Sequence, residues 1–457
     1  MVTSGRGLAD VATPAAGSPA PVASPPDTPA PAAVRLTLRQ CLELADKNHP
    51  NILSAQARAA YMKAQTSEAH TAPYSSFTLT TGVGPAPTFR GGQIYTQDTS
   101  VVGLSSSFGL AWQAGITGTV PIWTFGKITN LWKAAEAQVR VGEADAEKAR
   151  NAVRLDVRRA YYGYLLATEA LTLLDEAGGR LEQAVVPLKK KVDAGDADDA
   201  DLIQLQLAQV ELETRRAEAT RGQQVARAAL RFYTGVDRLE IQSAGLQAPK
   251  HGLTPLGDYL DAARSHRPEM RMALAGLEAR TAQVDLARAK MMPDIGLTLF
   301  ANYTRAPEIT QQLNPFTNYN ANSLTYGFAL GMRWSLDFLP ASARVRQAEA
   351  QLGEVRQSLR LALGGIATEV EKAYAEASEM KKKSEAYQRA QKLARQWMIR
   401  VAQGLDVGTS EEKDLIPPAR QYAQQRYNYL SALMDYNLAM ANLALATGWD
   451  VVAEPVD

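Results

Sequence analysis

The chain has 457 residues, 46% of them apolar, and its 49 Lys and Arg nearly balance 48 Asp and Glu. A net charge of +1 argues against a broad nucleic-acid-binding surface, so no nucleic-acid partner is expected. The single cysteine, Cys41, excludes an intramolecular disulfide, and the four histidines lack zinc-site spacing, so we expect no metal and no cofactor. Because no apolar run reaches about 18 residues, a helical membrane span is excluded, whereas alternating membrane strands are not.

Residues 1–34 are predicted to form a disordered arm. They are dominated by Pro, Ala, Ser and Thr, which supply too little apolar surface to form a core. The first ten residues contain no apolar segment of the kind found in signal peptides, so no export signal is expected in this chain.

The remainder is an internal duplication, with a first repeat expected at 35–247 and a second at 248–457. Each half has a short helix, a break at His49-Pro50 or Arg267-Pro268, a second helix, two strands and two long helices joined by a turn. The matching positions include Asp156 and Glu369, Tyr161 and Tyr374, Gly195 and Gly408, Asp201 and Asp414, and Thr234 and Thr447. So many matches in the same order favour duplication over chance.

Four segments alternate apolar residues with Gly, Ser and Thr, at roughly 75–84, 105–120, 294–304 and 325–337. Such strands suit a membrane barrel with an apolar outside and a small, polar inside. Four strands cannot close a barrel, since the smallest single-chain barrels use about eight, so this interpretation requires an oligomer. The alternative is a sheet packed on helices.

Long helices are predicted at about 127–192, 201–234, 341–402 and 414–447, because these stretches are rich in Ala, Arg, Glu and Leu and almost free of proline. About 60 helical residues span roughly 90 Å, a length typical of coiled coils. The fold class is therefore mainly α with a membrane β-barrel part. The alternative function is that of a soluble coiled-coil interaction or scaffold protein with an embedded β-sheet.

Several motifs resemble the TolC-type outer-membrane efflux proteins, also called outer membrane factors. The run Val120-Pro121-Ile122-Trp123-Thr124-Phe125-Gly126-Lys127 is similar to that family's strand-to-helix junction, and 36–50 and 427–448 are similar to its start and end. The usual Asn-Pro of the start is His49-Pro50 here. Lacking the family's Gly pair, the second junction, 334–340, is expected to start its helix at Pro340. Pro187, Pro417 and Pro418 are expected to kink or start helices near the turns.

This resemblance implies a homotrimer in which three chains complete one barrel in outer-membrane lipid and one helical tunnel in the periplasm. It implies the passive exit duct of a tripartite efflux or type I secretion system, with a periplasmic adaptor (membrane fusion) protein and an inner-membrane pump as partners. No nucleophile motif or phosphate-binding loop is present, so the chain is not expected to be an enzyme.

The two turns between long helices are rich in acids, from Asp193 to Asp201 and from Asp406 to Asp414. The simplest interpretation is solvated turns with acids that cap helices. The resemblance implies more, because an aspartate six residues after the turn glycine lines the duct aperture in the family. The aperture candidates are Asp201, Asp414, Asp198 and Asp199. The turns that would dock the adaptor contain Gly195, Ala197, Gly408 and Thr409. Leu405, Ser410 and Pro417 replace the family's other aperture residues. The resemblance therefore does not decide whether the closed aperture has an ionic latch.

Overall fold

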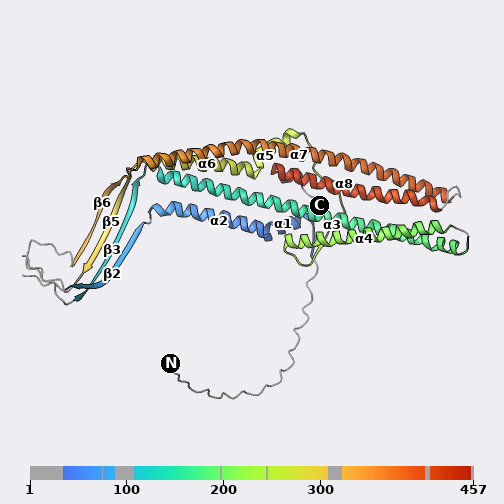
Figure 1. Ribbon diagram of the computed structural model, residues 1–457, viewed down its shortest axis with the longest axis horizontal. Helices are drawn as coiled ribbons and strands as arrows, with labels where there is room; N and C mark the ends of the chain where they lie inside the picture. Colours follow the sequence, from blue (N-terminus) through green and yellow to red (C-terminus); the bar gives the residue numbers. More distant parts are fainter. Residues whose placement is uncertain are drawn as a thin grey trace, which may run out of the picture.

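The computed structural model describes residues 34–74, 76–87, 108–195, 198–242, 245–306, 322–406 and 412–453. The molecule is long and narrow, with a sheet at one end and two helix-to-helix turns at the other (Figure 1). Most of the predicted arm and most of the two loops between paired strands lie outside the described residues.

The order of helices repeats, which agrees with the predicted duplication. The first half contains α1 (Leu38–Asn48), α2 (Pro50–Thr71), α3 (Lys127–Asp193) and α4 (Asp199–Thr234). The second half contains α5 (Leu256–His266), α6 (Pro268–Ala289), α7 (Phe338–Asp406) and α8 (Ile416–Thr447). Short 3-10 turns, η1 (Ala72–Tyr74), η3 (Glu412–Leu415) and η4 (Asp450–Ala453), border these helices.

Local sequence explains where these helices begin and end. Thr37 caps α1 through a reciprocal capping box with Gln40, and Pro50 and Pro268 occupy the first turn of α2 and α6, where a missing N–H is harmless. Gly235 and Gly448 end α4 and α8 in the left-handed conformation, with φ of +71° and +69°.

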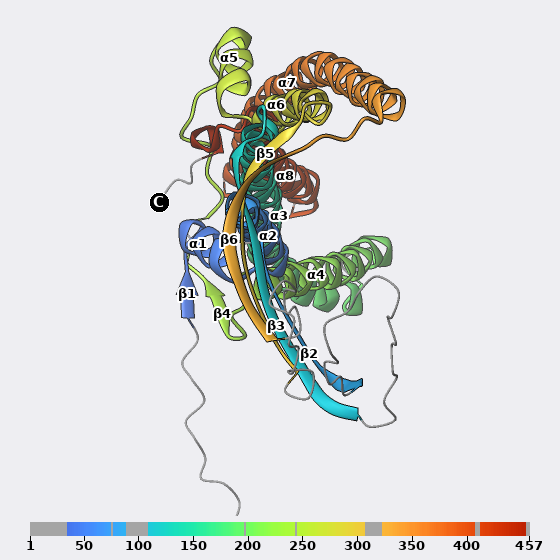
Figure 2. The same ribbon diagram turned by 90° about the vertical axis from the view of Figure 1, so that its left-hand side faces the viewer.

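The helices form one curved layer that is open at both margins. Near the sheet the neighbours are α2, α3, α6 and α7, and near the turns they are α4, α3, α8 and α7. The view from the sheet end shows this succession across the molecule (Figure 2). Consequently α2 and α4 form one margin of the layer and α7 forms the other. No helix of the described residues is long and apolar enough to cross a membrane.

The sheet comprises β2 (Phe77–Pro87), β3 (Phe108–Trp123), β5 (Asp294–Arg305) and β6 (Asn322–Arg333), antiparallel and in that order. Its register aligns the apolar positions of all four strands on one face, as the alternation predicted. One cross-strand row is Leu79, Ile116, Ala301 and Tyr326, and the next row on the opposite face is Thr80, Gly115, Asn302 and Thr325. A second sheet was not predicted: β1 (Val34–Leu36) pairs in parallel with β4 (Leu239–Ile241).

The junctions between sheet and helix differ in the two repeats. In the first, Phe125 and Gly126 have φ of +51° and +88° just before Lys127, whose Nζ donates to Asp294 Oδ1 at 2.7 Å. In the second, β6 ends at Arg333, before its predicted end at 337, and α7 begins at Phe338 rather than at Pro340. The alternation of apolar and small residues in the sequence therefore extends beyond the end of β6 into the junction, which is why the strand was predicted too long. Pro187 lies inside α3, and Pro417 and Pro418 lie in the first turn of α8.

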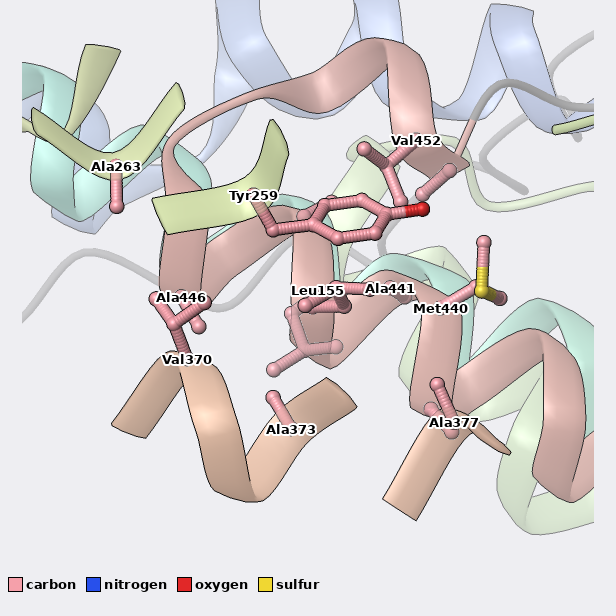
Figure 3. Close-up of a cluster of buried hydrophobic side chains, with 14 of the residues drawn as sticks. Leu155, Tyr259, Ala263, Val370, Ala373, Ala377, Met440, Ala441, Ala446 and Val452 are labelled. Carbon is pink, nitrogen blue, oxygen red and sulfur yellow. The ribbon is translucent and has the colours of Figure 1, made fainter. Parts of the chain in front are cut away.

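Each repeat has a core where its short helix packs on the long ones. In the second core, Tyr259 of α5 reaches between Val452 and the α8 residues Ala441 and Met440, with Val370 on the α7 side (Figure 3). Many of its members are alanines, which let helix backbones approach closely. In the first core, Cys41 of the short helix α1 is buried among apolar side chains. Burial raises the pKa of its thiol to about 12, so the thiol stays neutral.

A partly buried ion network joins the two repeats. Arg154 of α3 donates to Asp46 of α1 at 2.5 Å and to Asp450 of η4 at 2.6 Å, and Arg158 donates to Asp450 at 2.8 Å. Burial alone would lower the pKa of Arg154, but hydrogen bonds and the charges of both aspartates raise it above its ordinary value. Arg158 is 3% exposed, so its charge depends on Asp450 for compensation.

Replacing Asp450 with Asn should therefore destabilise the fold by about 2–3 kcal/mol, because the buried Arg158 loses its countercharge. The free energy of unfolding in detergent, measured by urea titration, checks this. The matched control is Asp261→Asn, whose partner Arg264 is exposed, with an expected loss below about 1 kcal/mol. Equal losses in the two variants would contradict the assigned role of the network.

Candidate functional site

The two helix-to-helix turns lie together at the end of the molecule farthest from the sheet (Figure 1). One turn joins α3 to α4 and the other joins α7 to α8, so the acid-rich segments of both repeats reach the same end. Within one chain, the fold therefore brings together the two regions that contain the predicted aperture residues.

The first turn is built by a left-handed glycine followed by an aspartate cap. Gly195 has φ of +80°, and its N–H donates to Val192 O at 2.9 Å, which ends α3. Asp198 then accepts a hydrogen bond from the N–H of Ala200 at 3.0 Å, which starts α4. Asp199 and Asp201 lie in the first helical turn, where the helix dipole favours negative charge.

The second turn is organised differently in its described part. Asp414 is exposed within η3, a 3-10 turn that precedes α8, rather than within the helix predicted from 414. No side-chain hydrogen bond caps α8 at Leu415, and its first turn begins with prolines instead. Gly408, Thr409 and Ala197 lie outside the described residues.

Of the predicted aperture residues, Asp198 and Asp199 are exposed and Asp201 is half-buried. The simplest interpretation from sequence was that acids of the turns cap helices, and in the first turn Asp198 is such a cap. Whether Asp201 and Asp414 also line an aperture depends on other copies of the chain, and stays a prediction.

Ion pairs that bridge the two hairpins were missed by the sequence analysis. Arg420 of α8 donates to Glu211 of α4 at 2.5 Å, and Arg426 of α8 donates to Glu176 of α3 at 3.3 Å. Both arginines project from the second hairpin toward the first. The pairing joins residues far apart in sequence, so no local pattern identifies these partners.

At the opposite end, the apolar face of the sheet is bare. Tyr326 and Phe328 are each 77% exposed, and Val83 is 71% exposed. The largest exposed side chains of this face also include Leu79, Phe108, Leu110, Leu324, Leu330 and Met332. An exposed apolar area of this extent marks a surface that meets lipid or another chain.

A sheet with a bare apolar face, continued by a long layer of helices (Figure 1), is typical of outer-membrane channel proteins. The chain belongs to the outer membrane efflux protein family, whose model matches residues 41–236 and 259–449, one segment in each repeat. It is therefore an outer-membrane protein with the TolC-like fold, in agreement with the sequence resemblance.

Solved channels share this fold at low sequence identity. The open state of MtrE from Neisseria gonorrhoeae has a TM-score of 0.73 and 17% identity, covering 91% of this chain and 90% of that one. CmeC from Campylobacter jejuni has a TM-score of 0.71 and 16% identity, covering 90% and 85%.

Two curated relatives are more similar in sequence over shorter regions. CyaE of Bordetella pertussis is 29% identical over 302 residues, which cover 63% of this chain and 60% of CyaE. The cobalt-zinc-cadmium resistance protein CzcC of Cupriavidus metallidurans is 25% identical over 182 residues, which cover 40% of this chain and 44% of CzcC. The chain thus matches less than two thirds of the length of either relative.

Removing the first cap, in Asp198→Ala, should fray the start of α4 by about 1 kcal/mol, because the N–H of Ala200 loses its acceptor. Hydrogen exchange of the first turn of α4 is then expected to accelerate about fivefold, with no change at α8. Asp199→Ala is the control, since it removes a neighbouring charge but leaves the cap. Equal acceleration in both variants would show that charge alone, and not the cap, holds this turn.

Proposed function

We propose that the chain forms, as a homotrimer, the passive outer-membrane exit duct of a tripartite efflux or type I secretion system. The observation that carries this proposal is that the sheet and the helix layer are open along corresponding margins. At one margin lie β2, α2 and α4, and at the other lie β6 and α7. A single chain is then one sector of a closed cylinder.

The sheet gives the strongest reason for closure. Each of the outer strands, β2 and β6, has one strand neighbour among those described, so its other edge has backbone groups without ladder partners. In lipid such groups cost several kcal/mol each, and only a closed barrel satisfies them all. Pairing β2 of one chain with β6 of the next closes the barrel with the apolar face outward.

The helix layer supports the same arrangement. Along the outer face of α4, Ile203, Leu207 and Val210 are exposed at helical spacing, and Leu393 and Trp397 are exposed on α7. These are the two margins of the layer. Contact between α4 of one chain and α7 of the next would bury both sets and continue the cylinder into the periplasm.

In this proposal the partners are a periplasmic adaptor protein and an inner-membrane pump. The adaptor would dock on the turns that contain Gly195, Ala197, Gly408 and Thr409. The pump supplies the energy, so the chain itself performs no enzymatic step and needs no cofactor. The name of one relative, a cobalt-zinc-cadmium resistance protein, is compatible with cationic cargo.

At the tip of the trimer, Asp201 and Asp414 would face the axis in three copies each. Like charges gathered around a narrow opening attract cations and repel anions. The pairs Arg420–Glu211 and Arg426–Glu176 would hold the second hairpin against the first and limit the width of the closed tip.

The lipid-facing assignment predicts opposite outcomes for adjacent residues of β6. Phe328→Arg should impair assembly in the outer membrane, because Arg on a lipid face costs about 2–4 kcal/mol near the bilayer centre. Ala329→Arg is the matched control, since its side chain would point to the polar face and should be tolerated. The amount of assembled protein in outer-membrane fractions checks both. Equal impairment by the two variants would contradict the assignment of faces.

The aperture assignment predicts a change in ion selectivity. The double variant Asp201→Asn, Asp414→Asn should lower the cation selectivity of single channels in a planar bilayer and weaken their block by divalent cations, because the ring loses its charge. Asp261→Asn, which removes an exposed acid of α5 far from the tip, should change neither property. Unchanged selectivity and block in the double variant would mean that these acids are solvated helix caps alone.

A further inference from the structure

The two repeats use the same joint to hold the return helix, but they differ in its central side chain. In each joint, the residue before the helix-starting proline closes one short helix and lies against the end of the long return helix. At the end of α1, the backbone N–H of His49 donates to Ala45 O at 3.0 Å. At the end of α5, the backbone N–H of Arg267 donates to Ala263 O at 3.3 Å. Both side chains are buried.

The second joint is held by a permanent charge. Arg267 Nη1 donates to Ala446 O, in the last turn of α8, at 3.1 Å, and its guanidinium also pairs with Glu369 of α7 and Glu269 of α6. A cation at a helix C-terminus is favourable, and a guanidinium does not lose its charge within the accessible pH range. This joint is therefore insensitive to mild acid.

The first joint has an imidazole where the second has a guanidinium. His49 packs against Phe232 and Tyr233, in the last turn of α4, with ring centroids 5.4 and 5.5 Å away. Its Nδ1 accepts the N–H of Asn51 at 3.3 Å, while its Nε2 is buried without a hydrogen-bond partner among the described residues. At the position that corresponds to Glu369, α3 carries Asp156, which is already paired with Arg159 at 3.1 Å.

We propose that His49 makes the first joint an acid-sensitive contact, which loosens the end of α4 as the surroundings acidify while the second joint stays closed. Because Nδ1 accepts a hydrogen bond, the neutral ring carries its proton on Nε2, and the second proton would bind at Nδ1. Protonation would add a charge to a buried ring packed against two aromatic side chains, and it would turn Nδ1 into a donor that faces the N–H of Asn51 while Nε2–H still lacks an acceptor. The device acts on the end of α4 opposite to the tip, and it does not depend on the proposed function.

The charged and titratable groups around His49 decide the sign of this effect. Three elements place such groups near this joint: α3 with Asp156 and Arg159, α4 with Tyr233, and α1 with Asp46 and Lys47. Asp46 is already bound by Arg154. Burial lowers the pKa of His49, and the charge of Asp156 opposes this effect without cancelling it. An opened joint therefore binds a proton more readily than the closed joint does. The stability of the closed joint is complete above the ordinary imidazole pKa of about 6.5 and decreases as the pH falls below it.

Hydrogen exchange of the full chain in detergent tests the proposal at pH 7.5 and pH 5.5, after correction for the intrinsic pH dependence of exchange. Exchange at the α1–α2 joint and at the end of α4 should rise at least about threefold at the lower pH, relative to the α5–α6 joint and the end of α8. In His49→Asn this rise should disappear, because the amide oxygen can accept from Asn51 and has no proton to gain. His266→Asn, which removes an exposed histidine beside Arg267, is the matched control and should keep the rise.

An acid response that persists in His49→Asn, or no acid response in the unaltered protein, would overturn the proposal. If His49→Asn does not fold, the titration of His49 itself decides the question. It can be followed by NMR of labelled histidine in the unaltered protein, assigned by replacing the other three histidines in turn. A midpoint below 6.5 is expected, and a midpoint at or above 6.5 would overturn the proposal.

Discussion

The unpaired edges of β2 and β6 impose the constraint on which the rest of this structure depends. A twisted four-stranded sheet with a bare apolar face is unfavourable in water, because its apolar side chains are exposed. In lipid, the unpaired backbone groups of its outer edges are unfavourable instead. The proposed closure by other copies would resolve both problems, because it would pair the edges and turn the apolar face outward. The helix layer has the same open margins, so in the proposed assembly one symmetry operation would serve the membrane part and the helical part together.

Closure of this kind requires each chain to keep a fixed curvature over its whole length. The ion network of Arg154, Arg158, Asp46 and Asp450 contributes to this by joining α1, α3 and η4 near the middle of the molecule. The two joints at His49 and Arg267 secure the ends of α4 and α8 in the same region. The tips, by contrast, rely on a glycine, an aspartate cap and exposed ion pairs, which are weaker constraints. This distribution suits a rigid middle with tips that can move.

Local sequence periodicity predicted the features that depend on local geometry. The alternation of Phe77, Leu79 and Val83 identified a sheet face because side chains of a strand alternate between faces, and the observed register confirms it. The expectation that acids of the turns cap helices followed from residue type, and Asp198 is such a cap. The three-residue pair β1 and β4 was missed, because strands this short show no periodicity and Val34 meets Leu239 across the whole first repeat. The ion pairs of Arg154 and Arg420 were missed because each joins segments that are far apart in sequence. The aperture itself needs neighbouring chains, and no pattern within one chain specifies their placement.

The most direct test of this account is the oligomeric state of the solubilised protein. Multi-angle light scattering, with the detergent contribution subtracted, should give a protein mass three times that of one chain, and the value should not change on dilution. Three copies are expected because the resemblance to the TolC-type family implies a homotrimer, in which one four-stranded sheet from each chain contributes to a single barrel. A stable mass of one chain would contradict the account, because the edges of β2 and β6 would then remain unpaired in the membrane, and a stable mass of two chains would contradict the proposed trimer.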